Sequence, residues 1–167
     1  MSKLNIKVYP DPILRRKASL IAKVGKEEQK LAYNMIETMR DSDGVGLAGP
    51  QVGIGKRIIV MEDVDNKSAL VFINPRIVKK KGRSRFCEGC LSMPGITNDV
   101  IRPSSVVVEA INLDGDAIKI DAKGLLARIL QHEIDHLDGI LFIDRINFLK
   151  RKQITKKIKA SKTCVEF

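Results

Sequence analysis

The stretch Gln131-His132-Glu133-Ile134-Asp135-His136 holds both histidines of this 167-residue chain, four positions apart and with a glutamate between them. It lies within residues 124–137, which contain no proline or internal glycine and whose apolar residues recur at three- and four-residue steps. This pattern predicts a helix. Because the apolar residues cover most of the helix circumference, we expect the helix to run through the core.

The helix places His132 and His136 on one face, with their Cβ atoms roughly 6 Å apart. At that spacing two imidazole nitrogens can bind one metal ion at about 2.0 to 2.1 Å. Glu133 is rotated by about 100° from His132, so it flanks the metal and can act on a bound water. The alternative is two core histidines that share a face by chance. Burying two imidazoles without partners is costly, which favours the metal.

The composition predicts one domain, since 167 residues with 44% hydrophobic content suffice for one core and are too few for two. No segment approaches about 18 consecutive apolar residues, and no apolar run follows the charges at the amino terminus. We therefore expect a soluble, cytoplasmic protein with no membrane partner. The three cysteines, without an export signal, favour reduced thiols over a disulfide framework.

The net charge of +10 is concentrated near the end of the chain, where residues 145–167 hold eight basic residues and one acidic residue. A partial helical stripe runs through this segment, formed by Ile146, Leu149, Ile154 and Ile158. We predict a single domain over residues 1–149 and a basic helical tail over residues 150–167. The last four residues have the form of a prenylation motif, but the charge of Glu166 argues against that modification.

The rest of the chain predicts short strands joined by turns. Asp11 is expected to cap a helical turn at residues 12–16, and residues 26–40 have the spacing of an amphipathic helix. We expect strands at residues 57–61, 69–74, 77–79, 100–102, 105–110 and 117–120, with a hairpin turn at 112–116. Short strands joined by turns favour antiparallel pairing, so the predicted class is α+β with the buried helix late in the chain.

Residues 43–53 contain four glycines and one proline, which predicts an irregular loop whose backbone can approach another group closely. A phosphate-binding loop is the first alternative. No Lys-Ser or Lys-Thr pair follows these glycines, only a helix is expected before them, and the match to a dinucleotide fingerprint is weak. We therefore disfavour a nucleotide site.

A catalytic metal site of this kind requires a third protein ligand and an open position for water. The candidates are Cys87, Cys90 and Cys164, and Cys90 is favoured because residues 86–95 are expected to form a glycine-flanked turn beside the helix. If Cys87 joined Cys90 and both histidines, a closed structural zinc site would result, but the separation of Cys90 from His132 is too long for a zinc finger. A redox pair would need a βαβ context. Cys87 is explained more simply as a small buried apolar side chain.

Three motifs stand in order along the chain: residues 44–51 (GVGLAGPQ), 88–92 (EGCLS) and 131–136 (QHEIDH). Together they resemble the motifs of the bacterial peptide deformylases, and the resemblance extends over residues 8–144. It implies an α+β fold in which antiparallel β-sheets pack around a central buried helix carrying HExxH, with a carboxy-terminal helix. The implied reaction is hydrolysis of the formyl group from the amino-terminal formylmethionine of newly synthesised polypeptides, with release of formate by the catalytic domain.

The resemblance implies three kinds of role: metal ligation by Cys90, His132 and His136, general acid/base catalysis by Glu133, and oxyanion stabilisation by Gln51 and the backbone amide of Leu91. Each role has a chemical basis. A metal lowers the pKa of its bound water towards 7, and a positioned carboxylate can pass the water's proton to the departing amine. A donor aimed at the developing oxyanion contributes about 3 to 4 kcal/mol.

The substrate also has expected contacts. Gly46 and Gly89 are expected to leave room for an extended substrate backbone that pairs like a strand. The methionine side chain needs an apolar pocket, and the candidates beside the motifs are Val45, Phe86, Leu125 and Ile129. These four residues are equally explained as ordinary core.

The sequence departs from the family pattern in three places. Gly49 stands where the family usually has alanine, which is expected to loosen the loop that aims Gln51, although Pro50 can offset this. Cys87 adds a thiol near a metal ligand, so oxidation to a Cys87–Cys90 disulfide would inactivate the enzyme. The basic tail matches poorly.

The resemblance implies Fe²⁺ as the working metal, one per chain, with Zn²⁺, Ni²⁺ or Co²⁺ able to replace it. The ligands alone would equally suit zinc. Members of the family dock on the ribosome through a carboxy-terminal helix, and a basic tail fits contact with RNA phosphates. A solvated basic helix that binds nothing specific is equally compatible with the charge.

Two other functions compete with deformylation. A metallopeptidase of the HExxH class would cut internal amide bonds, but such an enzyme usually takes its third ligand from downstream, whereas Cys90 lies upstream of the histidines. A basic RNA-binding module with a structural metal would leave Glu133 without a chemical role. Formate release and the effect of a Glu133 substitution separate these functions.

Overall fold

The computed structural model describes residues 3–63 and 68–163, with side chains described up to residue 158. Its α-helices are α1 (Lys26–Asp41), α2 (Gly124–Leu137) and α3 (Phe148–Thr163). Its strands are β1 (Gly46–Ala48), β2 (Ile58–Asp63), β3 (Ser68–Lys81), β4 (Ser84–Gly89), β5 (Thr97–Arg102), β6 (Ser105–Ile111) and β7 (Ala117–Lys123). Short 3-10 helices are η1 (Pro12–Arg15), η2 (Gly49–Val52) and η3 (Phe142–Arg145).

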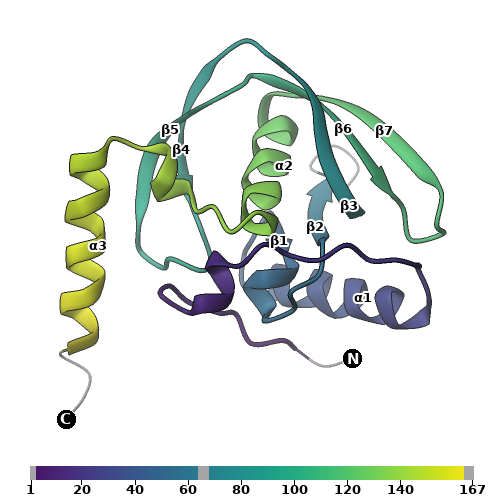
Figure 1. The fold of residues 1–167 in the computed structure, drawn as a ribbon, viewed down its shortest axis with the longest axis horizontal. Coiled ribbons are helices and arrows are strands. Elements are labelled where there is room, and N and C mark those ends of the chain that lie inside the picture. Colours follow the sequence, from purple (N-terminus) through teal and green to yellow (C-terminus); the bar gives the residue numbers. More distant parts are fainter. Residues whose placement is uncertain (1–2, 64–67, 164–167) are drawn as a thin grey trace.

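Helix α2 lies in the middle of the molecule with strands around it, and α1, which packs against β1 and β2, lies below it in the view of Figure 1. The larger sheet has the strand order β1-β2-β3-β6-β7, and β4 pairs with β5 in a separate two-stranded sheet. All of these pairs are antiparallel. The predicted α+β class, with antiparallel sheets around a central helix and a helix near the end of the chain, is confirmed.

The helix predictions are confirmed in position. Helix α2 covers the predicted residues 124–137, and every residue from Ala127 to Leu137 is buried. Helix α1 extends the prediction by one residue. The Asp11 side chain accepts a hydrogen bond from the Ile13 N–H at 3.0 Å, so it caps η1 as expected.

The strand predictions need three corrections. The segment expected as an irregular loop contains β1, which pairs with β2 through its backbone. The two strands expected on either side of Pro75 are one strand, β3, with register shifts against β6 between Ile73 and Arg76 and between Ile77 and Lys79. β4 covers the first part of the segment expected as a turn, so Cys90 follows a strand directly. Backbone pairing with other strands formed these strands despite their glycine or proline content.

Helix α3 begins at Phe148, two residues before the predicted tail, and packs against the rest of the molecule through Ile154 and Ile158. Leu149, expected in the same stripe, is 66% exposed. The division into a domain over 1–149 and a tail over 150–167 stays a prediction, and Cys164 with the last four residues lies outside the described part. None of the helices described combines the length and apolar character that a membrane span needs.

Candidate metal centre and active-site cleft

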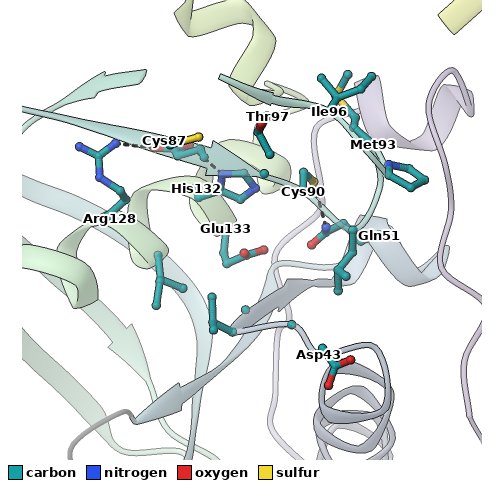
Figure 2. Close-up of a pocket in the computed structure, with 18 of the residues that line it drawn as sticks. Asp43, Gln51, Cys87, Cys90, Met93, Ile96, Thr97, Arg128, His132 and Glu133 are labelled. Atoms are coloured by element: carbon teal, nitrogen blue, oxygen red, sulfur yellow. Dashed lines mark hydrogen bonds and ion pairs between the residues drawn. The ribbon is translucent and has the colours of Figure 1, made fainter. Parts of the chain in front are cut away.

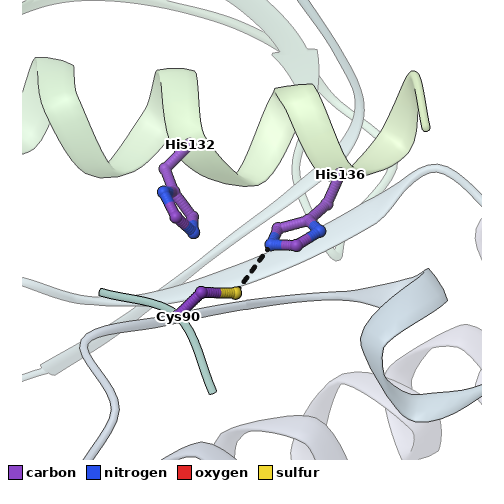
Figure 3. Close-up of side chains that lie close together, drawn as sticks. All are labelled: Cys90, His132 and His136. Carbon is purple, nitrogen blue, oxygen red and sulfur yellow. Dashed lines mark hydrogen bonds between the residues drawn. The ribbon is translucent and has the colours of Figure 1, made fainter. Parts of the chain in front are cut away.

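Cys90, His132 and His136 meet at one point. Cys90 directly follows β4, whereas both histidines belong to α2 (Figure 3). The three candidate ligand atoms all lie within 4.8 Å of one another, and the Cys90 Sγ is 3.2 Å from the His136 Nε2. One thiol and two imidazoles therefore surround a volume that a single metal ion can fill.

Glu88 determines which nitrogen of His132 faces the other ligands. The Glu88 Oε2 is 3.0 Å from the His132 Nδ1, so the Nε2 is left for a metal. The other Glu88 oxygen accepts hydrogen bonds from Arg102 Nε and Arg128 Nη1, both at 2.6 Å. Burial opposes ionisation of Glu88, but the hydrogen bonds from His132 and Arg102 outweigh it and lower the pKa of Glu88 to about 2. Glu88 is thus a buried anion that orients the imidazole.

A second buried carboxylate extends this network across α2. The Asp135 Oδ2 accepts a hydrogen bond from Arg102 Nη1 at 2.6 Å, and the Asp135 Oδ1 accepts one from Arg145 Nη2 at 2.5 Å. Sequence reasoning assigned these residues no role. Arg128 and Asp135 are charged residues in a helix that the sequence predicts to be buried. This was the signal that could have found them, because buried charges need partners.

Glu133 lies beside the ligand group with its carboxylate buried. Its Oε2 has no hydrogen-bond partner among the described residues. Burial raises the pKa of Glu133 to about 7, against the opposing effect of the positive charges of His132 and Arg102. A β-carbon built at Gly46 would lie only 2.6 Å from the Glu133 Oε1. Gly46 therefore makes room for Glu133, and because it also lines the cleft, its expected role in making room for a substrate backbone stays a prediction.

Gln51 is buried, and its amide is held at both ends. The Ala48 N–H donates to the Gln51 Oε1 at 2.7 Å, and the Gln51 Nε2 donates to the Cys90 Sγ at 3.5 Å (Figure 2). Gly49, two residues before Gln51, is also tightly packed, because a β-carbon there would lie 2.6 Å from the Lys56 carbonyl oxygen. Glycine at position 49 therefore permits a close backbone contact beneath Gln51.

The group opens into a cleft of about 440 Å³, shown in Figure 2. Gln51, Cys90, His132 and Glu133 are part of its lining, as are both Gly89 and Leu91. The apolar residues predicted for the methionine pocket all line the cleft, and they are Val45, Phe86, Leu125 and Ile129. The first three are about half exposed and are not ordinary core residues, whereas Ile129 is 5% exposed.

Cys87 is exposed, so the prediction that it is a small buried apolar side chain is wrong. Neighbouring side chains of a strand face opposite sides, and Glu88 takes the buried face of β4. Cys87 lines the cleft, but the group of potential metal ligands in the described residues contains Cys90 without it. The arrangement is therefore not a closed site with two cysteines and two histidines. Both cysteines are free thiols, and their oxidation to a disulfide stays a prediction.

The residues of this centre fit a bound metal ion. Burial lowers the pKa of His136 well below its usual value, which keeps the imidazole neutral, as a metal ligand must be. Burial opposes protonation of His132, but hydrogen bonds to Cys90 and Glu88 outweigh it and raise its pKa to about 10. A metal cation would take the place of that proton on the Nε2. The unpartnered Glu133 Oε2 leaves a hydrogen-bond acceptor free beside the ligands.

A cysteine sulfur and two imidazoles lie next to a buried glutamate in an apolar cleft. This arrangement defines the class of metal-dependent hydrolases built on a HExxH helix. The particular family follows from comparison with known sequences. The family model described as polypeptide deformylase matches residues 3–152, and the chain belongs to this family.

Individual relatives agree with this assignment along almost the whole chain. A peptide deformylase of Thermodesulfovibrio yellowstonii is 50% identical over 165 residues, which are 97% of this chain and 100% of the relative. The crystal structure of a peptide deformylase from Legionella pneumophila has 40% sequence identity and a TM-score of 0.90, covering 98% of this chain and 97% of that chain. The crystal structure of a peptide deformylase from Ehrlichia chaffeensis in complex with actinonin has 37% sequence identity and a TM-score of 0.90. The match covers 96% of this chain and 98% of that chain.

Proposed function

We propose that this protein is a peptide deformylase that removes the formyl group from the amino-terminal formylmethionine of newly synthesised polypeptides and releases formate. The observation that carries this proposal is the convergence of Cys90, His132 and His136 beside Glu133 in an apolar cleft. The names of its relatives support the reaction. Nascent chains are made in the cytoplasm, and we place the protein there.

In this proposal Cys90, His132 and His136 hold the metal. When bound, the metal acidifies a water molecule and polarises the formyl carbonyl. Glu133 accepts the proton of the attacking water on its carboxylate and then delivers it to the departing amine. Its unpartnered Oε2 supports this role, because a carboxylate oxygen already engaged by the protein would have less capacity to accept a proton.

Two donors are proposed to stabilise the oxyanion that develops on the formyl group. The Gln51 Nε2 faces the ligand group because the Ala48 N–H holds the other end of the amide. Leu91 follows Cys90 directly and lines the same cleft, so its backbone N–H is the second candidate. Donors that are oriented before the reaction need not reorganise when the charge develops.

The substrate contacts follow the walls of the cleft. We propose that the methionine side chain packs against Val45, Phe86, Leu125 and Ile129, which line the cleft next to the glutamate. The peptide backbone would extend along the edge of β4 near Gly89, where a built β-carbon lies 3.4 Å from the nearest atom, Thr97 Cγ2. Gly46 also lines the cleft, and we propose that it leaves room for the substrate backbone as well as for Glu133.

The decisive experiment uses formyl-Met-Ala-Ser as substrate. We expect formate release with an intact Met-Ala bond, whereas cleavage of that bond would identify a metallopeptidase and refute the proposal. Glu133→Gln should retain the bound metal and lose roughly 100-fold or more in kcat, because only the proton acceptor is removed. Full activity in this variant would refute the assigned mechanism.

We propose ferrous iron as the native metal, with zinc, nickel or cobalt able to replace it. One thiolate and two imidazoles suit several divalent first-row metals, so the ligands alone do not select iron. Metal analysis of protein purified without oxygen, paired with the formate assay, tests this assignment. Zinc as the metal of the most active fraction would overturn it.

We also propose that the outer face of α3 contacts ribosomal RNA. Lys152 and Lys156 are exposed one helical turn apart on this helix, and phosphate contacts by basic residues are strongly salt-dependent. Lys152→Glu combined with Lys156→Glu should weaken co-sedimentation with ribosomes at low salt and leave hydrolysis of formyl-Met-Ala-Ser unchanged. Unchanged co-sedimentation would favour a solvated helix that binds nothing specific.

A further inference from the structure

A second groove, of about 380 Å³, lies between the start of β5 and helix α3. One wall consists of residues 95–98, and the other consists of Lys150, Gln153, Ile154 and Lys157. These four helix residues are spaced as i, i+3, i+4 and i+7, which places them on one face of α3. The groove exists because α3 stands beside the β4–β5 sheet, as Figure 1 shows.

The groove adjoins the active-site cleft. Gly95, Ile96 and Thr97 line both the cleft and the groove, so the same short segment forms a wall of each. In Figure 2, Ile96 and Thr97 lie across the cleft from Asp43. A peptide that leaves the cleft across this segment would therefore reach the groove beside α3.

The groove differs from the cleft in its chemistry. Lys150 and Lys157 are exposed, and among the described residues neither forms an ion pair. Asn98 and Gln153 add amide groups, and none of the residues that line the groove is acidic. Ile154 supplies an apolar side chain, itself packed on the cluster that contains Met93 and Phe142. The positive charges and amide groups of this groove complement acidic side chains on an extended peptide.

We propose that this groove is a further subsite, which binds residues of the formylated peptide downstream of its first residue and prefers acidic side chains there. The inference rests on the proposed function, because it assumes that the formylated end of the peptide lies at the metal centre and that the following residues run towards α3. It adds a residue preference that the cleft alone, lined mainly by apolar residues, does not provide. The two lysines act on binding and take no part in bond cleavage.

The test uses formylated hexapeptides that begin Met-Ala and carry a single Glu or a single Lys at position 3, 4, 5 or 6 among alanines and serines. We expect kcat/KM from formate release to be higher for Glu than for Lys at one or two adjacent positions, by roughly two- to fivefold, as for exposed charge pairs. The preference should decrease as salt is raised, because salt screens exposed charges. Equal kcat/KM at every position would overturn the subsite.

The combined substitution of Lys150→Glu and Lys157→Glu should reverse this preference, whereas hydrolysis of formyl-Met-Ala-Ser should stay as in the wild type. The matched control combines Lys152→Glu with Lys156→Glu, which changes the net charge equally on a face of α3 outside the groove. An unchanged Glu preference in the first variant, or an equal change in both variants, would overturn the subsite. Absence of formate release from every peptide, including formyl-Met-Ala-Ser, would instead refute the proposed function.

Discussion

Gly46 touches the carboxylate that is proposed to move the proton. A β-carbon at this position would lie 2.6 Å from the Glu133 Oε1 and 2.8 Å from the Ile129 Cγ2. We therefore expect Gly46→Ala to displace Glu133 and lower kcat by about 100-fold, while the metal content stays near that of the wild type. Formate release measures kcat, and metal analysis of the same preparation measures the metal content. Gly55→Ala is the control, because no described residue other than its two chain neighbours has an atom within 4 Å of a β-carbon there. Equal kcat in the two variants would contradict this prediction.

Gly49 provides a second prediction for a single residue, because the resemblance to the family leads us to expect alanine at this position. In this chain a β-carbon at Gly49 would lie 2.6 Å from the Lys56 carbonyl oxygen and 2.8 Å from that of Ile54. Backbone atoms cannot move aside as a side-chain end can, so we expect Gly49→Ala to lower the free energy of unfolding by about 1 to 3 kcal/mol. Urea denaturation, with Gly55→Ala as the control, measures the loss. A variant as stable as the wild type would show that the 54–56 turn adapts freely.

Three elements meet at Glu88, which lies on β4 and accepts hydrogen bonds from β5 and α2. Through the His132 Nδ1 this carboxylate orients one imidazole of the metal centre. We expect Glu88→Gln to weaken metal affinity by about 10- to 100-fold, as is typical when the partner of a ligating histidine is changed. Competition with a chelator measures the affinity, and circular dichroism verifies the fold. Glu109→Gln, which alters an exposed ion pair on β6, should retain wild-type affinity.

Asp144 contacts both η1, near the start of the chain, and α3, near its end. Its carboxylate accepts hydrogen bonds from Arg15 of η1 and from the Leu141 N–H, and it pairs with Arg151 of α3 at 2.9 Å. Burial opposes ionisation of Asp144, but the hydrogen bonds from Arg15 and Leu141 and the nearby positive charges outweigh it and hold the pKa below the usual value of 3.8. The ionised carboxylate therefore stabilises the whole fold.

Because the pKa of Asp144 is lower in the folded than in the unfolded state, its contribution is fully present above about pH 4 to 5 and is lost as the pH falls through the folded-state value. We expect Asp144→Asn to lower the free energy of unfolding by about 1 kcal/mol at pH 7 and by less below pH 3.8. Melting temperatures from pH 7 to pH 3 measure this difference. Asp121→Asn, at an exposed site of β7, is the control. A constant difference across that range would contradict the assignment.

The strongest sequence predictions concern features that are local in the chain. The periodicity of residues 124–137 predicted a buried helix, and α2 has those bounds. The four-residue spacing of His132 and His136 places them on one helix face by helix geometry alone, and both side chains belong to the ligand group with Cys90. The cap at Asp11 is equally local, because its partner is two residues away. The catalytic roles of Glu133, Gln51 and Leu91 stay predictions.

The sequence by itself therefore determined the fold class, the central helix and the order of three motifs along the chain, because these depend on periodicity and spacing within short segments. Only the tertiary structure decided that β1 and β4 form, since each depends on backbone pairing with a partner elsewhere in the chain. It also decided that Cys87 is exposed in the cleft while Glu88 is buried beside His132, because the face that each β4 side chain occupies is set by what packs against the strand.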